Sequence, residues 1–137
     1  MANALYGLGR QKFLECDAGV DWATADIACY LLDTAYSVSI DTHEFRDSIG
    51  TPTSTSGNLA SKTTTLGVAD AADLAPAFST VLVGEGQQSY VVIANSGTAG
   101  TSPLIVYIDT ATGLPVTPNG GDINITWDSG ASKIFKL

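Results

Sequence analysis

Residues 88–110 read QSYVVIANSGTAGTSPLIVYIDT, and this stretch decides the fold. Two runs rich in β-branched and aromatic residues, 88–95 and 104–110, flank a segment of Ser, Gly, Thr and Pro. Such runs are typical of strands, and the polar segment between them is typical of a turn. The stretch therefore predicts two short strands that follow one another closely along the chain.

The same alternation of short apolar runs and turn residues continues on both sides of this stretch. Further strands are expected within 23–34, 36–40, 59–68, 78–83, 123–128 and 133–137, and 50–58 is expected to be a loop. Residues 41–50 predict one helical turn, with Thr42 as its N-cap and Phe45 and Ile49 on one face. No stretch is typical of a crossover helix between parallel strands. We therefore expect an all-β fold, an antiparallel β-sandwich with a short N-terminal helix or arm.

The expected core follows from the two-residue period of a strand. Residues spaced by two in one strand share a face of the sheet, so each such set is expected to be buried together. The predicted core residues are Ile27, Cys29, Leu31, Val91, Ile93, Ile105, Tyr107, Ile125 and Trp127.

The N-terminal segment differs from the rest, and we divide the chain into an arm or short helix at 1–15 and one sandwich domain at 16–137. A helix is expected around 8–15, but Gly7 and Gly9 weaken it by about 1 kcal/mol each relative to alanine. We predict that residues 2–14 form an attachment element for a partner protein or a sister subunit; the alternative is a helix that closes one end of the sandwich. The candidate contact residues are Leu5, Tyr6, Leu8, Arg10, Lys12 and Phe13.

Charge and hydropathy exclude several classes of partner. The 137 residues hold 6 Lys and Arg against 14 Asp and Glu, a formal net charge of -8. Binding nucleic acid or an anionic membrane needs clustered cations, so we expect neither partner. The longest apolar runs are far shorter than the roughly 20 residues of a membrane span, and the N-terminus does not resemble a signal peptide. We expect a protein made and folded in a cytoplasm, without a membrane anchor.

Catalytic and metal-binding patterns are missing from the sequence. The single histidine, His43, has no partner histidine for a zinc site and no serine elbow for a triad. The acidic pairs Asp26/Asp33 and Asp70/Asp73 are the kind that any chain with 14 acids offers. We expect no enzyme activity, no cofactor and no metal.

The remaining candidates have structural interpretations. Cys29 is expected to be a core residue, and a bond between it and Cys16 is left open. Trp22 and Trp127 are expected to cover the two ends of the sandwich instead of forming a sugar-binding platform.

Several motifs resemble a family of small virion proteins of tailed bacteriophages. They are MANALYGLGRQKFLE at 1–15, CYLLDTA at 29–35 after Trp22, THEF at 42–45, and TSPLIVYIDTATGLPVTPNGGDINITWDSGASKIFKL at 101–137. The resemblance covers nearly the whole chain, is strongest in the C-terminal forty residues and is weakest in 50–85. The chain departs from the family in carrying Cys16 and Cys29.

The resemblance implies a structural protein of the virion, a capsid decoration (cement) protein of jelly-roll type that binds and stabilises the assembled head. Its implied partner is the major capsid protein, its place is the capsid surface, and no catalytic residue carries over. Symmetric capsid positions favour closed oligomers, so we also expect a homodimer or homotrimer. The alternative is a neck- or tail-associated module, or a host-glycan-binding β-sandwich.

Overall fold

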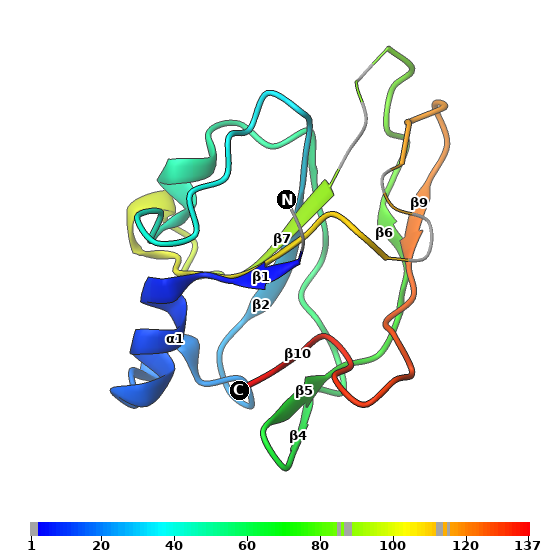
Figure 1. The fold of residues 1–137 in the computed structure, drawn as a ribbon. Helices are drawn as coiled ribbons and strands as arrows, with labels where there is room; N and C mark the ends of the chain where they lie inside the picture. Colours follow the sequence, from blue (N-terminus) through cyan, green and yellow to red (C-terminus); the bar gives the residue numbers. More distant parts are fainter. Residues whose placement is uncertain (1–2, 85, 87–88, 112–113, 115) are drawn as a thin grey trace.

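The computed structural model describes residues 3–84, 86, 89–111, 114 and 116–137. The protein is mostly β, with antiparallel sheets and one short α-helix (Figure 1). The all-β prediction is confirmed at this level. Within the described ranges, no helix combines the length and the apolar character that a membrane crossing requires.

The largest sheet has five strands in the order β1-β8-β7-β2-β3. Its strands are β1 (Ala4–Leu5), β2 (Ile27–Leu32), β3 (Ser54–Thr55), β7 (Ser89–Ala94) and β8 (Leu104–Ile108). β2 and β7 pair over six residues without interruption, from Ile27 opposite Ala94 to Leu32 opposite Ser89. The runs of Val, Ile, Leu and Tyr in these strands suit a pleated surface that is covered on both sides.

Two smaller sheets and several helical turns complete the fold. One sheet has the order β10-β5-β4 and the other pairs β6 with β9. Their strands are β4 (Thr63–Thr65), β5 (Val68–Asp70), β6 (Leu74–Phe78), β9 (Ile123–Ile125) and β10 (Phe135–Lys136). The helices are α1 (Gly7–Leu14) and the 3₁₀ turns η1 (Ala18–Val20), η2 (Arg46–Ile49) and η3 (Ala99–Thr101).

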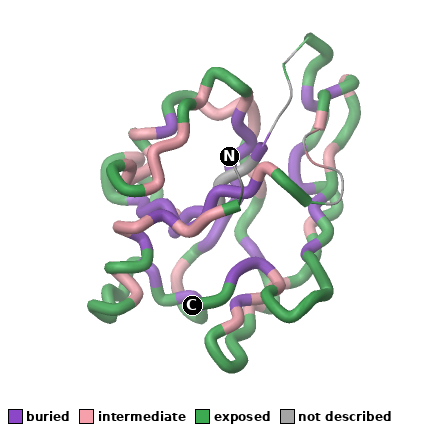
Figure 2. Tube along the Cα trace, in the orientation of Figure 1, coloured by how far each residue is buried: buried purple, intermediate pink, exposed green. Residues whose placement is uncertain are grey.

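The five-stranded sheet is buried on both faces, as β2 illustrates (Figure 2). Its residues alternate between two core clusters: Ile27, Cys29 and Leu31 face one, and Ala28, Tyr30 and Leu32 face the other. The first cluster also contains buried residues of β5, β6, β9 and β10. The second is closed by Tyr6, Ile49 and the half-buried residues Tyr36, Val38 and Ile40. The sheet thus lies between the smaller sheets on one face and the 36–49 segment on the other.

The predicted core residues are confirmed as buried where they are described, but two of them do not share the face of the sheet that was expected. All of them are buried except Val91, whose side chain lies outside the described set. Ile105 and Tyr107, however, belong to different clusters. Ile93 pairs with Leu104 and Val92 pairs with Val106, so Ile105 is an extra residue in β8. Such a bulge reverses the facing of every residue beyond it.

Five local predictions were wrong. The single strand expected within 59–68 is a hairpin of β4 and β5, and the loop expected at 50–58 contains β3. Residues 36–40 form no strand; they cross the second cluster as a loop, and this half-buried path produces the same alternation as a strand. The strand expected at 78–83 ends at Phe78, because Thr80 has a left-handed φ of 50°. The helical turn is η2, and Phe45, not Thr42, precedes its first residue.

Candidate functional site

The six candidate contact residues lie along β1 and α1, and most of them are packed into the domain. Tyr6 is fully buried, and the Phe13 ring packs against Phe135 in a tilted arrangement with ring centroids 5.8 Å apart. Lys12 bonds Glu44 Oε1 at 3.1 Å and lies over the Phe45 ring. Leu5 and Leu8 are half-buried, and only Arg10 of the six is exposed.

The N-terminal segment is therefore part of the sheet, and the prediction of a separate arm at 2–14 needs correction. Ala4 and Leu5 pair with Tyr107 and Val106 of β8. The Tyr6 amide donates to the Ile105 carbonyl at 2.9 Å, and the Gly7 amide donates to the Ile40 carbonyl at 2.9 Å. The two glycines do weaken a free helix, but Gly9 also lets α1 approach the β8 backbone directly. Close packing on the sheet supplies the order that an isolated arm would lack.

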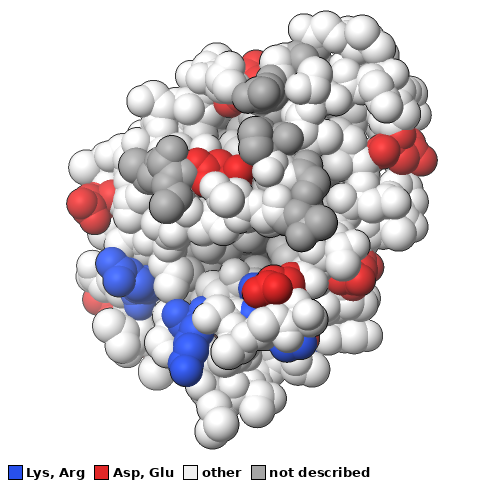
Figure 3. Space-filling view, turned by 45° about the vertical axis from the view of Figure 1, so that its right-hand side comes forward, with Lys and Arg blue, Asp and Glu red and all other residues white. Residues whose placement is uncertain are grey.

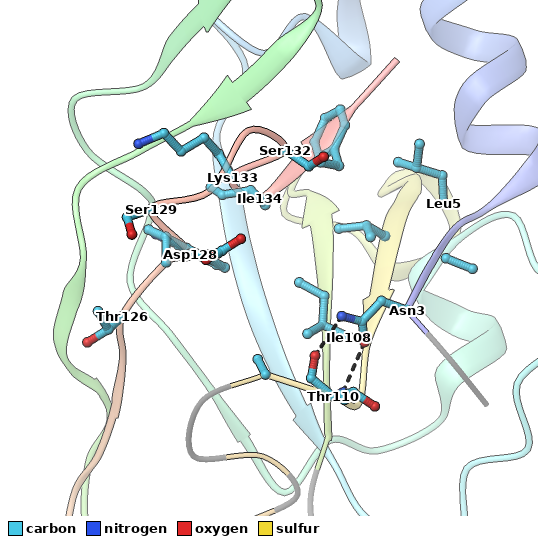
Figure 4. Close-up of a pocket in the computed structure, with 15 residues that line it drawn as sticks. Asn3, Leu5, Ile108, Thr110, Thr126, Asp128, Ser129, Ser132, Lys133 and Ile134 are labelled. Carbon is cyan, nitrogen blue, oxygen red and sulfur yellow. Dashed lines mark hydrogen bonds between the residues drawn. The ribbon is translucent and has the colours of Figure 1, made fainter.

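A groove of about 690 Å³ opens beside β1 (Figure 4). One wall is formed by β1 and the end of β8, including Asn3, Leu5 and Ile108, and the other by the segment from Thr126 to Phe135. Its lining mixes apolar side chains with hydroxyl groups, one carboxylate (Asp128) and one ammonium group (Lys133). Lys133 also pairs with Asp70 at 3.6 Å.

The Asn3 side chain fixes the end of this groove. Its Nδ2 donates to the Thr110 carbonyl at 2.7 Å, and its Oδ1 accepts from the amides of Asp109 and Thr110 at 2.9 and 3.0 Å. The amide thus replaces one peptide unit of a strand and continues the β1–β8 pairing (Figure 4). Among the described residues that line the groove, apolar side chains stand beside hydroxyl and charged groups, a composition that suits binding of an extended surface of mixed character.

Sequence reasoning missed this groove, because its two walls are far apart in the chain. Residues 129–132 carried only a turn signal, and nothing in the sequence brings a C-terminal turn beside Asn3. The contact depends on the path of β9 and β10 back to the first core cluster.

His43 is part of a chain of hydrogen bonds on the other face of the sheet. The hydroxyls of Tyr6 and Tyr36 are 2.8 Å apart, and the Tyr36 hydroxyl is 2.8 Å from His43 Nδ1. Burial, followed by the hydrogen bond to Tyr36, raises the pKa of Tyr6 far above its usual value of 10. Burial also raises the pKa of Tyr36. Both phenols therefore stay protonated at neutral pH, and the arrangement holds the 36–49 segment on the sheet.

Replacing Tyr36 by phenylalanine is expected to lower the free energy of unfolding by about 2 kcal/mol, because it leaves the buried Tyr6 hydroxyl unpaired. Tyr6→Phe is the matched control. It removes the buried hydroxyl itself, while Tyr36 keeps its bond to His43, so the expected loss is below about 1 kcal/mol. Chemical denaturation of both variants measures the difference. A larger loss in Tyr6→Phe than in Tyr36→Phe would contradict this account.

The tryptophans and the acidic pairs have structural partners. Trp22 and Trp127 are 4% and 8% exposed, and their indole nitrogens donate to the carbonyls of Asp70 and Ala72. They are therefore not available as an open sugar-binding platform. Asp73 accepts from the Trp127 amide at 2.9 Å.

The two cysteines differ in their exposure to solvent. Cys16 is exposed and Cys29 is buried, and both are free thiols. Among the described residues, no group of three or more His, Cys, Asp or Glu side chains is placed to hold a metal ion. In Figure 3 the visible Lys and Arg side chains lie in the lower half of the molecule, and the visible Asp and Glu side chains are spread over the face.

In comparisons with known proteins, no protein-family model matches the chain, and no curated protein matches its sequence.

Proposed function

We propose that this chain is a structural protein of a bacteriophage virion, a decoration protein that binds the assembled head and stabilises it. The observation that carries the proposal is the resemblance of residues 1–15, 29–35, 42–45 and 101–137 to small virion proteins of tailed phages. The major capsid protein is the proposed partner, and the capsid surface is the proposed place.

The structural roles of the resembling segments support this proposal. Residues 29–35 and 101–137 supply β2, β8, β9 and β10, and thus much of the first core cluster. Residues 1–15 supply β1 and α1, which pack on β8. A pattern concentrated in core segments suits a family defined by its scaffold and not by a catalytic centre.

We also propose that the sheets form a jelly-roll-like β-sandwich. The chain leaves the five-stranded sheet after β3, returns to it with β7 and β8, and leaves it again with β9 and β10. The first core cluster lies between the five-stranded sheet and buried residues of the smaller sheets. Both features support two layers around a shared core.

The proposed contact with the capsid is the groove beside β1 together with the exposed face of α1. Leu5 and Ile108 offer apolar area in the groove, and the hydroxyls and Asp128 offer polar partners along it. Arg10 is exposed nearby on α1, and no ion pair is found for it within the described residues. An apolar centre with a polar rim is the usual composition of a protein interface.

Heads that lack this protein test the proposal. They are expected to release DNA at a lower temperature than complete heads, and added purified protein is expected to restore the difference. Arg10→Glu is expected to restore less while keeping the melting temperature of the free protein, because Arg10 makes no core contact. Asn124→Asp, which adds negative charge at the exposed residue of β9, is the control and should restore fully. Heads whose stability does not depend on the protein would overturn the proposal.

A further inference from the structure

Leu66 occupies a position that suits it poorly, both in conformation and in exposure. It is the first residue of the two-residue turn between β4 and β5, in which Thr65 pairs with Val68. Leu66 and Gly67 have φ angles of 52° and 79°, the pattern of a type I′ turn that favours Asn, Asp or Gly. The leucine side chain is 91% exposed at the tip of a hairpin that projects from the lower end of the molecule (Figure 1). Folding of the single chain does not explain a leucine here.

An apolar cavity lies directly beside this hairpin. Its volume is about 450 Å³, and its floor contains Phe13, Trp22 and Phe135. The rings of Trp22 and Phe135 meet edge to face with centroids 5.2 Å apart. The hairpin contributes Thr64 and Gly67 to the lining, and residues 16–18, 20, 21 and 23 line the cavity as well.

Exposed leucines extend this apolar surface around the cavity. Leu137, which lines the cavity, is 57% exposed, and its amide donates to the Gly67 carbonyl. Leu14, the residue after Phe13 in α1, is 85% exposed but is not among the residues that line the cavity. Exposed apolar groups that gather beside a cavity mark an interaction surface.

The described cavity lining has an acidic wall, whereas an exposed cation of the hairpin's sheet lies outside the lining. Asp17 and Asp21 line the cavity, and Asp17 is 3.7 Å from Lys12. The hairpin turn itself is uncharged, and the exposed Lys136 of β10 lies opposite Val68. No ion pair of Lys136 is found in the part of the chain that the structure describes. A rotation that places the hairpin of one copy over the cavity of another brings Lys136 toward the acidic wall.

We propose that this surface binds a second copy of the chain about a two-fold axis, with Leu66 of each copy in the apolar cavity of the other. A protruding group beside a matching cavity is self-complementary under such an axis, and one rotation forms both contacts. Burial in the partner gives a use to the exposed Leu66 and covers Leu137, which lines the cavity. The inference stands on this surface alone and does not rest on the proposed virion function.

Sedimentation equilibrium of the purified full-length protein tests the proposal. Over an approximately hundredfold range of concentration, the apparent mass is expected to rise from 14.1 kDa toward twice that value. Leu66→Asn is expected to raise the dimer dissociation constant about a hundredfold. Each lost leucine contact weakens binding about tenfold, and a two-fold dimer contains this contact twice. Asparagine also suits the turn, so the melting temperature of this variant should equal or exceed that of the wild type.

Two further variants separate the surface from its hairpin. Ala18→Glu lies on the exposed wall of the cavity and is expected to weaken the dimer without changing the turn. Leu82→Asn removes a leucine that is 68% exposed in the loop after β6, and it should dimerise like the wild type. The exposed thiol of Cys16, which also lines the cavity, should be alkylated more slowly as the dimer forms.

Either of two results would overturn the proposal. One is a wild-type protein that stays monomeric over the whole range, and the other is a Leu66→Asn variant that dimerises as tightly as the wild type. A monomeric wild type whose binding to phage heads is lost in Leu66→Asn would assign the surface to a head protein, and it too would overturn self-association.

Discussion

Gly9→Ala is expected to destabilise the protein by roughly 3 kcal/mol, although alanine is the better helix former. Gly9 is buried where α1 packs on β8, and a Cβ there would lie far inside contact distance of the Leu104 carbonyl oxygen. The obstacle is strand backbone and cannot rotate away as a side chain would. The helix would have to move off the sheet, together with Tyr6 and Phe13. Urea denaturation measures the loss.

Gly7→Ala is the matched control in the same helix. A Cβ at Gly7 would have its nearest contact with Asp41 Oδ1 at 3.4 Å, an ordinary van der Waals distance. We therefore expect unchanged stability or a gain of about 0.5 kcal/mol. Equal effects of the two substitutions would contradict the close approach of α1 to β8.

The second large effect is expected at high pH. Complete burial raises the pKa of the Cys29 thiol from 9.0 to about 12. Because the folded protein holds this proton more tightly than the unfolded chain, the contribution is fully present below pH 9 and is lost as the pH rises toward 12. A pKa shift of three units corresponds to about 4 kcal/mol of folding stability. Tyr6 and Tyr36, whose pKa values are also raised, add to the loss above pH 10.

The Cys29→Ala variant isolates the thiol contribution. It is expected to be less stable than the wild type by about 1 kcal/mol at neutral pH, because it removes a buried sulfur atom. Its stability should then fall less steeply between pH 9 and 10, where the tyrosines still contribute little. Denaturation curves at several pH values measure both slopes. Parallel pH profiles of variant and wild type would show that Cys29 titrates as an exposed thiol.

The central strands could be predicted from sequence because their signal is local. Runs of β-branched and aromatic residues at 27–32, 89–94 and 104–108 are strands in the structure. The bulge at Ile105 was not predictable in the same way, since it depends on how β8 aligns with β7. Residues 36–40 alternate like a strand, but they lie on a face of the five-stranded sheet. The backbone N–H and C=O groups of that sheet already pair between neighbouring strands, so its face offers no edge for another strand.

The N-terminal segment illustrates the limit for functional surfaces. The glycines at 7 and 9 indicate a weak isolated helix, and they do not reveal that Gly9 meets the Leu104 carbonyl. The groove beside Asn3 and the cavity beside Leu66 each join segments that are more than forty residues apart in the chain. Only the fold brings these walls together. The sequence predicts one strand within 59–68, so the turn at Leu66 and Gly67, where leucine is unusual, is evident only in the structure.

The number of copies per virion distinguishes a head decoration protein from a component of the neck or tail. Quantitative mass spectrometry of purified particles gives the ratio of this chain to the major capsid protein. A decoration protein repeats with the capsid lattice, so we predict hundreds of copies per particle. A count on the order of ten would place the protein at the neck or tail and would contradict the proposed function.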